Sequence, residues 1–88
     1  MTQAADRITV DLDRSVALVI FDFLARTSDE QAGEPFAEAL DHPAELHALW
    51  ALLAALDEVL TEPFQRDYQR HVDKARQWVI THMGSAAG

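Results

Sequence analysis

The sequence predicts an all-α fold of three main helices with a short extended arm ahead of them. Apolar residues recur every three or four positions over most of the chain, as on one face of a helix. The prolines and glycines lie between these periodic segments or at their ends. Eighty-eight residues suffice for one hydrophobic core, so we expect residues 1–88 to form a single domain. The arm is expected at about 7–12, the helices at about 14–27, 43–61 and 66–83, and frayed ends at 1–6 and 84–88.

The arm has the alternation of a β-strand. Ile8, Val10 and Leu12 fall on one side, and polar residues fall on the other. The segment is short and has no clear partner strand within the chain. Pairing across a two-fold axis with the arm of a second copy would provide one.

The first helix is expected to start after Asp13, a candidate cap for its first turn. Its alanine and leucine content, and the spacing of four between Asp22 and Arg26, favour a helix. The β-branched and aromatic residues of 16–23 keep a strand as the alternative, which would form a hairpin with 8–12. In the helical interpretation one face collects Val16, Val19, Ile20, Phe23 and Leu24.

The second helix is the clearest element of the sequence. Pro43 suits a first helical position, and no helix breaker follows before Thr61. Two apolar stripes run along different sides of this segment, so we expect it to need neighbours on more than one side. The other two helices or a second copy of the chain would supply them. One stripe consists of Leu46, Leu49, Leu53, Leu56 and Leu60, and the other of Ala48, Leu52, Ala55 and Val59.

The third helix follows Pro63, and Gly84 is placed to end it in a left-handed cap. Apolar residues again recur by three and four, with polar residues on the opposite side. The connections between the helices are short enough for antiparallel neighbours. The apolar face holds Phe64, Tyr68, Val72, Ala75, Val79 and Met83.

The chain carries a net charge of −8, which is distributed unevenly. Residues 1–62 hold three basic and thirteen acidic residues, whereas 63–88 hold four basic and two acidic residues. Phosphate and anionic lipids repel a mainly acidic surface, so we expect neither nucleic acid nor a membrane as partner. The sequence contains neither a long apolar run nor a signal-peptide pattern, and we expect a cytoplasmic protein.

Few residues offer chemistry for catalysis or metal binding. The chain has no cysteine, and no two histidines have the one-turn spacing of a metal site, so we expect no metal and no cofactor. Asp67 and His71 stand one turn apart and are expected to form an ion pair. Asp22 is expected to pair with Arg26, and an acid–base or metal-dependent enzyme built around Asp22 is the alternative. We expect no catalytic residue and no enzyme activity.

Acidic residues crowd the C-terminal end of the second helix, where the helix dipole disfavours negative charge. Asp57, Glu58 and Glu62 form this acidic patch. Arg66 and Arg70, which follow the next turn, are the expected compensating charges. A basic residue on a partner protein is the alternative.

These observations favour a protein-interaction module that pairs with itself as a homodimer or binds another protein. The second hypothesis is an antitoxin or immunity protein whose acidic surface neutralises a basic toxin or nuclease. Tryptophan often anchors interfaces, although it is also common in cores. The candidate interface residues are Ile8, Val10, Leu12, Trp50, Leu52 and Val59.

The chain resembles small bacterial proteins of uncharacterised function along residues 8–80. The likeness rests on an Ile-x-Val-x-Leu lead, an Ala-Leu-Val-Ile-Phe-Asp-Phe-Leu-Ala-Arg helix, an Ala-Glu-Leu-His-Ala-Leu-Trp helix and the string Glu-Pro-Phe-Gln-Arg-Asp-Tyr. These motifs are hydrophobic rather than catalytic, so the resemblance transfers no site residue. It implies a stand-alone helical domain in a bacterial cytosol.

Overall fold

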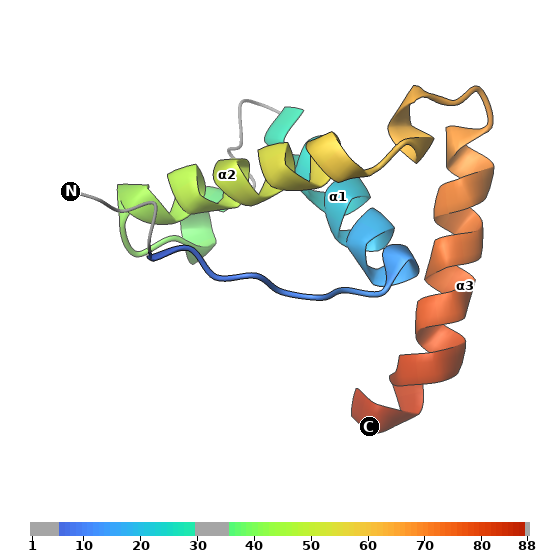
Figure 1. Ribbon diagram of the computed structural model, residues 1–88. Coiled ribbons are helices and arrows are strands. Elements are labelled where there is room, and N and C mark those ends of the chain that lie inside the picture. The colour runs from blue at the N-terminus through green and yellow to red at the C-terminus, as the bar shows by residue number, and fades with distance from the viewer. Residues whose placement is uncertain (1–5, 30–35, 88) are drawn as a thin grey trace.

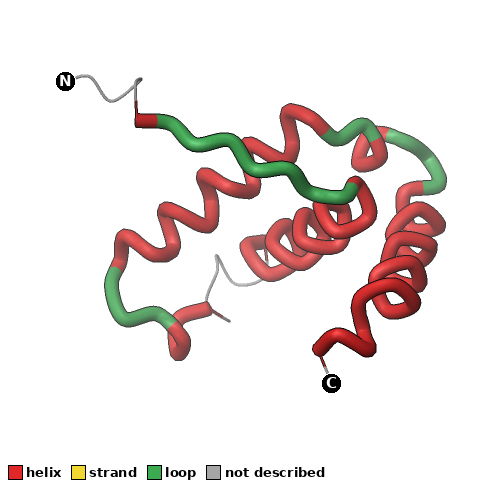
Figure 2. The backbone as a smooth tube through the Cα atoms, turned by 60° about the horizontal axis from the view of Figure 1, so that its bottom comes forward, coloured by secondary structure: helices red, strands yellow, loops and turns green. Residues whose placement is uncertain are grey.

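The computed structural model describes residues 6–29 and 36–87 of the chain and has the predicted all-α fold (Figure 1). The described residues contain no β-strand, and residues 16–23 are helical rather than part of a hairpin (Figure 2). A short 3₁₀ turn at 36–39 precedes the second helix. The main helices are α1 (Arg14–Asp29), α2 (Pro43–Val59) and α3 (Tyr68–Ala87), with the 3₁₀ helix η3 (Glu62–Phe64) between the last two.

Residues at the N-terminal ends of α1 and α2 form the capping contacts that the sequence favours. At α1 the Asp13 carboxylate accepts a hydrogen bond from the Ser15 backbone N–H at 2.9 Å. At α2 Pro43 occupies the first turn, and His42 Nδ1 accepts from the Ala44 N–H at 3.0 Å. Glu45 completes that end, because its Oε1 accepts from the Asp41 backbone N–H at 2.7 Å.

The predicted stop at Gly84 is wrong, because α3 continues through it to Ala87. A glycine permits a left-handed cap but does not impose one. A Cβ added at Gly84 would meet only Ile80 Cγ2, at 3.7 Å, which is ordinary van der Waals contact. Of the predicted frayed ends, residues 1–5 and 88 lie outside the described residues, and 84–87 are helical.

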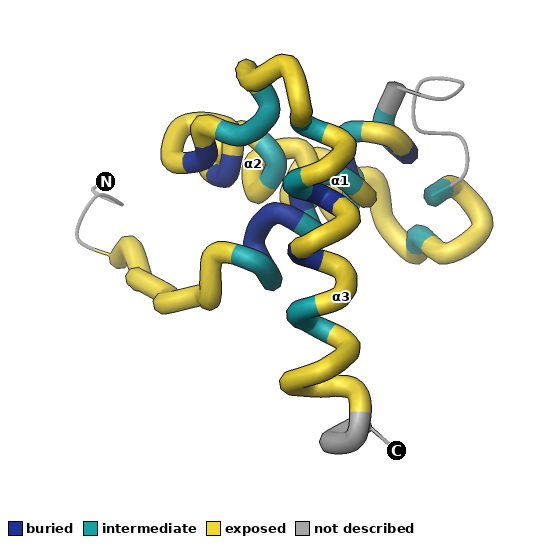
Figure 3. The backbone as a smooth tube through the Cα atoms, turned by 90° about the vertical axis from the view of Figure 1, so that its right-hand side faces the viewer, coloured by how far each residue is buried: buried dark blue, intermediate teal, exposed yellow. Residues whose placement is uncertain are grey.

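The helix with neighbours on two sides is α1. It packs against both α2 and α3, and α3 also contacts η3 (Figure 1). The core therefore lies where the middle of α1 meets the end of α2 and the first half of α3 (Figure 3). Its buried residues are Ala17, Leu18, Phe21, Leu56, Leu60, Val72 and Ala75, with Val72 fully buried.

The protomer is more open than a compact domain of its mass. Its accessible surface is 6747 Å², against about 5,200 Å² expected for a compact monomer of 9.8 kDa. Its radius of gyration is 14.7 Å, against roughly 12 Å for a compact chain of this length. A single core cannot cover both ends of the longer helices, so much of α2 and α3 stays exposed (Figure 3).

Candidate interaction surface

One side of α2 is packed and the other is exposed and apolar. We call the exposed strip the outer face of α2. Adjacent residues project about 100° apart around a helix, so spacings of three and four keep this strip on one side. The strip contains no charged residue and consists of Ala44, Ala48, Ala51, Leu52, Ala55 and Val59, all of which are exposed.

The other stripe, which is made of leucines, packs on α1. Leu56 retains 6% of its exposure, and Leu60, directly after the helix, retains 3%. Leu53 is half-buried against the same core. The predicted excess of apolar surface on this helix is therefore present in the single chain, because α1 covers only one of its two stripes.

The six candidate interface residues are all exposed, but they do not form one surface. Leu52 (40% exposed) and Val59 (66%) belong to the outer face of α2. Trp50 (38%) projects from another flank and lines an open hollow of about 320 Å³ between α1 and α2. That hollow is also lined by Phe21, Ala25, Leu53, Ala54 and Asp57.

The N-terminal arm is extended and exposed along its described length (Figure 3). Ile8 is 86% exposed, Val10 66% and Leu12 46%. The strand alternation of the sequence thus finds no partner strand among the described residues (Figure 2). These three apolar side chains are exposed and belong to the arm, not to the outer face of α2.

The acidic patch divides into a paired and an unpaired part. Both carboxylate oxygens of Glu62 accept from Arg14, at 2.7 and 2.9 Å. These hydrogen bonds lower the pKa of Glu62 and raise that of Arg14. Asp57 and Glu58 are exposed and form no ion pair within the described part of the chain.

The predicted compensation of the patch by Arg66 and Arg70 is wrong. Neither arginine forms an ion pair with the patch among the described residues, and Arg14 neutralises Glu62 instead. Arg14 lies 48 positions earlier in the sequence, at the start of α1. Only the packing of α1 beside η3 brings the two side chains together, so no local pattern in the sequence could indicate the pair.

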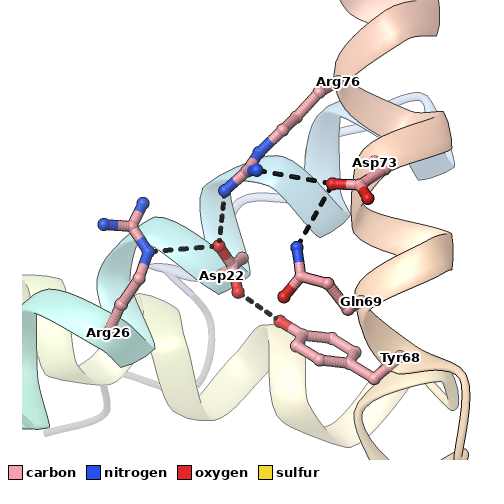
Figure 4. A network of polar contacts seen from close by, with 6 residues as sticks. All are labelled: Asp22, Arg26, Tyr68, Gln69, Asp73 and Arg76. Atoms are coloured by element: carbon pink, nitrogen blue, oxygen red, sulfur yellow. Dashed lines mark hydrogen bonds and ion pairs between the residues drawn. The ribbon is translucent and has the colours of Figure 1, made fainter.

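Asp22 is the centre of a polar network that ties α1 to α3 (Figure 4). Its Oδ1 accepts from the Tyr68 hydroxyl at 2.8 Å, and its Oδ2 accepts from Arg26 and Arg76, each at 3.3 Å. The predicted pair with Arg26 is confirmed, whereas Tyr68 and Arg76 were not predicted. Burial of Tyr68 and its hydrogen bond to Asp22 raise the pKa of this phenol.

The surroundings of Asp22 suit a structural tie better than an acid–base centre. Two guanidinium groups and a phenol occupy the oxygens of its carboxylate, which is only 13% exposed. Asp73 joins the network at its edge, through Arg76 at 3.6 Å and Gln69 at 3.2 Å. The described residues hold no group of three or more histidine and acidic side chains that could bind a metal ion.

A second hollow, of about 260 Å³, lies between the start of α1 and α3. It is lined in part by Lys74, His71 and Trp78. His71 Nε2 lies 3.2 Å from Asp67 Oδ1, which confirms the predicted pair, and the Trp78 ring stacks on His82 at 4.2 Å. The hollow is shallow, and none of its described side chains is a buried polar group without a partner.

No family model, curated protein or solved structure matches the chain. Among the described helices, none combines the length and the apolar character that a membrane span requires.

Proposed function

We propose that this chain is a protein-interaction module of the bacterial cytoplasm that pairs with a second copy of itself through the outer face of α2, without catalytic activity of its own. The observation that supports the proposal most strongly is the outer face itself. It offers six exposed residues, including Leu52 and Val59, and no charge. Continuous apolar surface of this kind is typical of interaction sites.

The surface area of the protomer supports the same conclusion. A stable two-chain interface covers about 800 Å² on each partner. The accessible surface of 6747 Å² exceeds that expected of a compact monomer by roughly 1,500 Å². One interface of ordinary size would remove about half of this excess, which is spread over the arm, α2 and α3.

A second copy fits the outer face better than a basic partner does. A basic protein would be recognised by carboxylates, but the strip contains none: Glu58 lies beside it, and Asp57 lines the hollow between α1 and α2 on another side of the helix. These two unpaired carboxylates are the observation that favours the antitoxin or immunity alternative. We place Glu58 at the margin of the interface, where charges set orientation more than affinity.

Molar mass measured by light scattering across a concentration series tests the proposal. We expect the wild-type protein to change from one to two chains as its concentration rises to high micromolar. Ala55→Glu places a charge in the outer face, and we expect it to weaken pairing by tenfold or more. Gln77→Glu adds the same charge on α3 and is the matched control, for which we expect nearly wild-type pairing.

A strictly monomeric wild-type protein at high micromolar concentration would overturn the proposal. Equal behaviour of Ala55→Glu and Gln77→Glu would also contradict it, because pairing would then use another surface. Circular dichroism of each variant establishes that the helices are retained.

Salt dependence separates a second copy from a basic partner. Two copies that each carry a net charge of −8 repel one another, and added salt screens that repulsion. We expect self-association to strengthen several-fold as sodium chloride is raised from low to moderate concentration. Binding between an acidic and a basic protein would weaken over the same range.

A further inference from the structure

We infer that the hollow between α1 and α2 is a binding site for a small organic cation with an apolar body, of the arylalkylammonium class. The inference does not rest on self-pairing, because Trp50 and Asp57 line the hollow on a different side of α2 from the outer face. Three features of the hollow support it: its size, its apolar walls and the position of its carboxylate.

The hollow has the size of a small-molecule site. Its volume is about 320 Å³, at the lower end of the range of roughly 300–1,000 Å³ that is typical of ligand sites. Both α1 and α2 supply side chains to it, and spaces between helices are common places for ligands in helical proteins. A polypeptide partner needs a contact of about 800 Å², so a hollow of this size fits one small molecule better than a stretch of chain.

The walls of the hollow are apolar and include two aromatic rings. They consist of Phe21, Ala25, Trp50, Leu53 and Ala54. Trp50 is 38% exposed, and its ring meets the ring of His47 in a T-shaped contact with centroids 5.5 Å apart. An apolar ligand body would leave water for contacts with both helices, and the Trp50 ring offers it a face for stacking.

A carboxylate lies at one end of these walls. Asp57 is exposed and is the one charged residue among the described side chains that line the hollow. It forms no ion pair within the described residues, and the last turn of α2 holds no basic residue. The partial negative charge at the carbonyl end of the helix adds to that of the carboxylate. Both attract a cation and repel an anion.

The charged groups beside the hollow do not neutralise Asp57. Arg26 follows Ala25 of the wall, but it bonds to Asp22 at 3.3 Å. Asp22 also accepts from Arg76 of α3 at 3.3 Å, so this group of charges is engaged between α1 and α3. Glu58 is itself negative. The hollow therefore keeps an uncompensated negative charge that a cationic ligand would balance.

The spacing along α2 sets the shape of the ligand. Trp50 and Asp57 are seven positions apart, which is two helical turns and about 10 Å along the axis. Leu53 and Ala54 lie between them. A complementary molecule has a ring at one end, an ammonium group at the other and a short apolar chain between the two.

NMR titrations with three probes of the same body and different charge test the site. The probes are 4-phenylbutylammonium, 4-phenylbutanol and 4-phenylbutyrate. The chain has two tryptophans, so the indole N–H signal of Trp50 reports on this hollow, and that of Trp78, which lines the second hollow, is the internal control. We expect the cation to shift the Trp50 signal saturably, with a dissociation constant of about a few millimolar. The alcohol should bind at least threefold more weakly, and the carboxylate at least tenfold more weakly.

Asp57→Asn and Glu58→Gln form a matched pair of variants, because each removes one negative charge from adjacent positions. We expect Asp57→Asn to weaken binding of the cation at least threefold and to leave binding of the alcohol within twofold of wild type. Glu58→Gln should leave binding of the cation within twofold. Circular dichroism of both variants establishes that the helices are retained.

Absence of a saturable Trp50 shift at any soluble concentration of the cation would overturn the inference. Equal affinity for the cation and the alcohol, or equal weakening by the two variants, would overturn it as well, because Asp57 would then select nothing. An equal shift of the Trp78 signal would show unspecific binding and have the same consequence. A strictly monomeric wild-type protein would overturn only the proposed pairing and leave this site intact.

Discussion

The two faces of α2 are built from similar residues and have different surroundings. Leu56 in the inner stripe retains 6% of its exposure, whereas Leu52, one turn earlier at the edge of the outer face, retains 40%. Both belong to regular apolar stripes of the same helix. What distinguishes them is that, among the described helices, α2 packs mainly on α1, which covers the inner stripe and leaves the outer face exposed.

This difference shows that an apolar stripe in a sequence does not identify the surface that covers it, which can belong to the same chain or to a partner. The inner face of α2 contributes to the folding of the chain, while the outer face is surface that the fold leaves available. The position of α3 matters here, because the Asp22 network and the Arg14–Glu62 pair hold α1 against α3 and η3. Mutations on the two faces should therefore separate folding from association.

The largest expected effect comes from Leu53→Asp. Leu53 packs against the core, and a charge there has no partner, so we expect a loss of about 3 kcal/mol or more in the free energy of unfolding. That loss is large enough to unfold much of the protein, as circular dichroism would detect. The neighbouring change Leu52→Asp should keep the helices and prevent pairing. Comparable loss of structure in the two variants would contradict the division of α2 into two faces.

Truncation of matched leucines sharpens the comparison without adding charge. We expect Leu56→Ala to lower the free energy of unfolding by about 2 to 5 kcal/mol, because it leaves a cavity in the core. Leu52→Ala should cost less than about 1 kcal/mol in the isolated protomer. Urea unfolding at a concentration low enough to keep both variants monomeric provides the measurement. A larger loss of stability in Leu52→Ala than in Leu56→Ala would contradict the assignment of Leu56 to the core.

Tyr68→Phe tests the tie that places α3 on α1. We expect a loss of about 1 kcal/mol, because the hydrogen bond to Asp22 disappears while both arginines remain. The folded protein raises the pKa of Tyr68, so the stabilisation is fully present below pH 10 and is lost as pH rises through the folded-state pKa. The chain has one tyrosine, so its absorbance titration follows this phenol alone. A midpoint near pH 10 in the folded protein would show that the hydroxyl is not held as described.

Glu62→Gln should destabilise the protein less than Tyr68→Phe does, because its partner Arg14 is 55% exposed and solvent screens the pair. The pKa of Glu62 is lowered in the folded state, so its contribution is present above about pH 4.5 and is lost as pH falls through the folded-state pKa. We therefore expect the wild-type protein to lose stability between about pH 5 and pH 3 more steeply than Glu62→Gln. The free energy of unfolding can be measured with urea between about pH 5 and pH 3. The same pH dependence in both proteins would show that Glu62 does not contribute to the loss of stability in acid. At neutral pH the wild-type protein and Glu62→Gln should self-associate to the same extent.

Patterns that are local in the sequence predicted the parts of this structure that depend on near neighbours. The helical period located all three helices, and spacings of four identified the Asp22–Arg26 and Asp67–His71 pairs. The same period separates Trp50 from Leu52 and Val59, although these residues were grouped as one candidate interface.

Contacts between segments that lie far apart in the sequence could not be predicted from the sequence. Arg14 and Glu62 are 48 positions apart, and Asp22 and Tyr68 are 46 positions apart. Each pair depends on how the helices pack, which periodicity does not encode. For the same reason the sequence did not show that α1, rather than α2, is the central helix. Both segments carry enough apolar surface to fill that position.

The most direct test of the outer face as an interface measures its accessibility as the protein concentration rises. A maleimide reagent would label Ala55→Cys on the outer face and, as a matched control, Thr81→Cys on the exposed surface of α3. We expect the labelling rate at position 55 to fall at least fivefold between low and high micromolar protein, while the rate at position 81 stays constant. Equal and unchanged rates at both positions would contradict the claim that a second copy covers the outer face of α2.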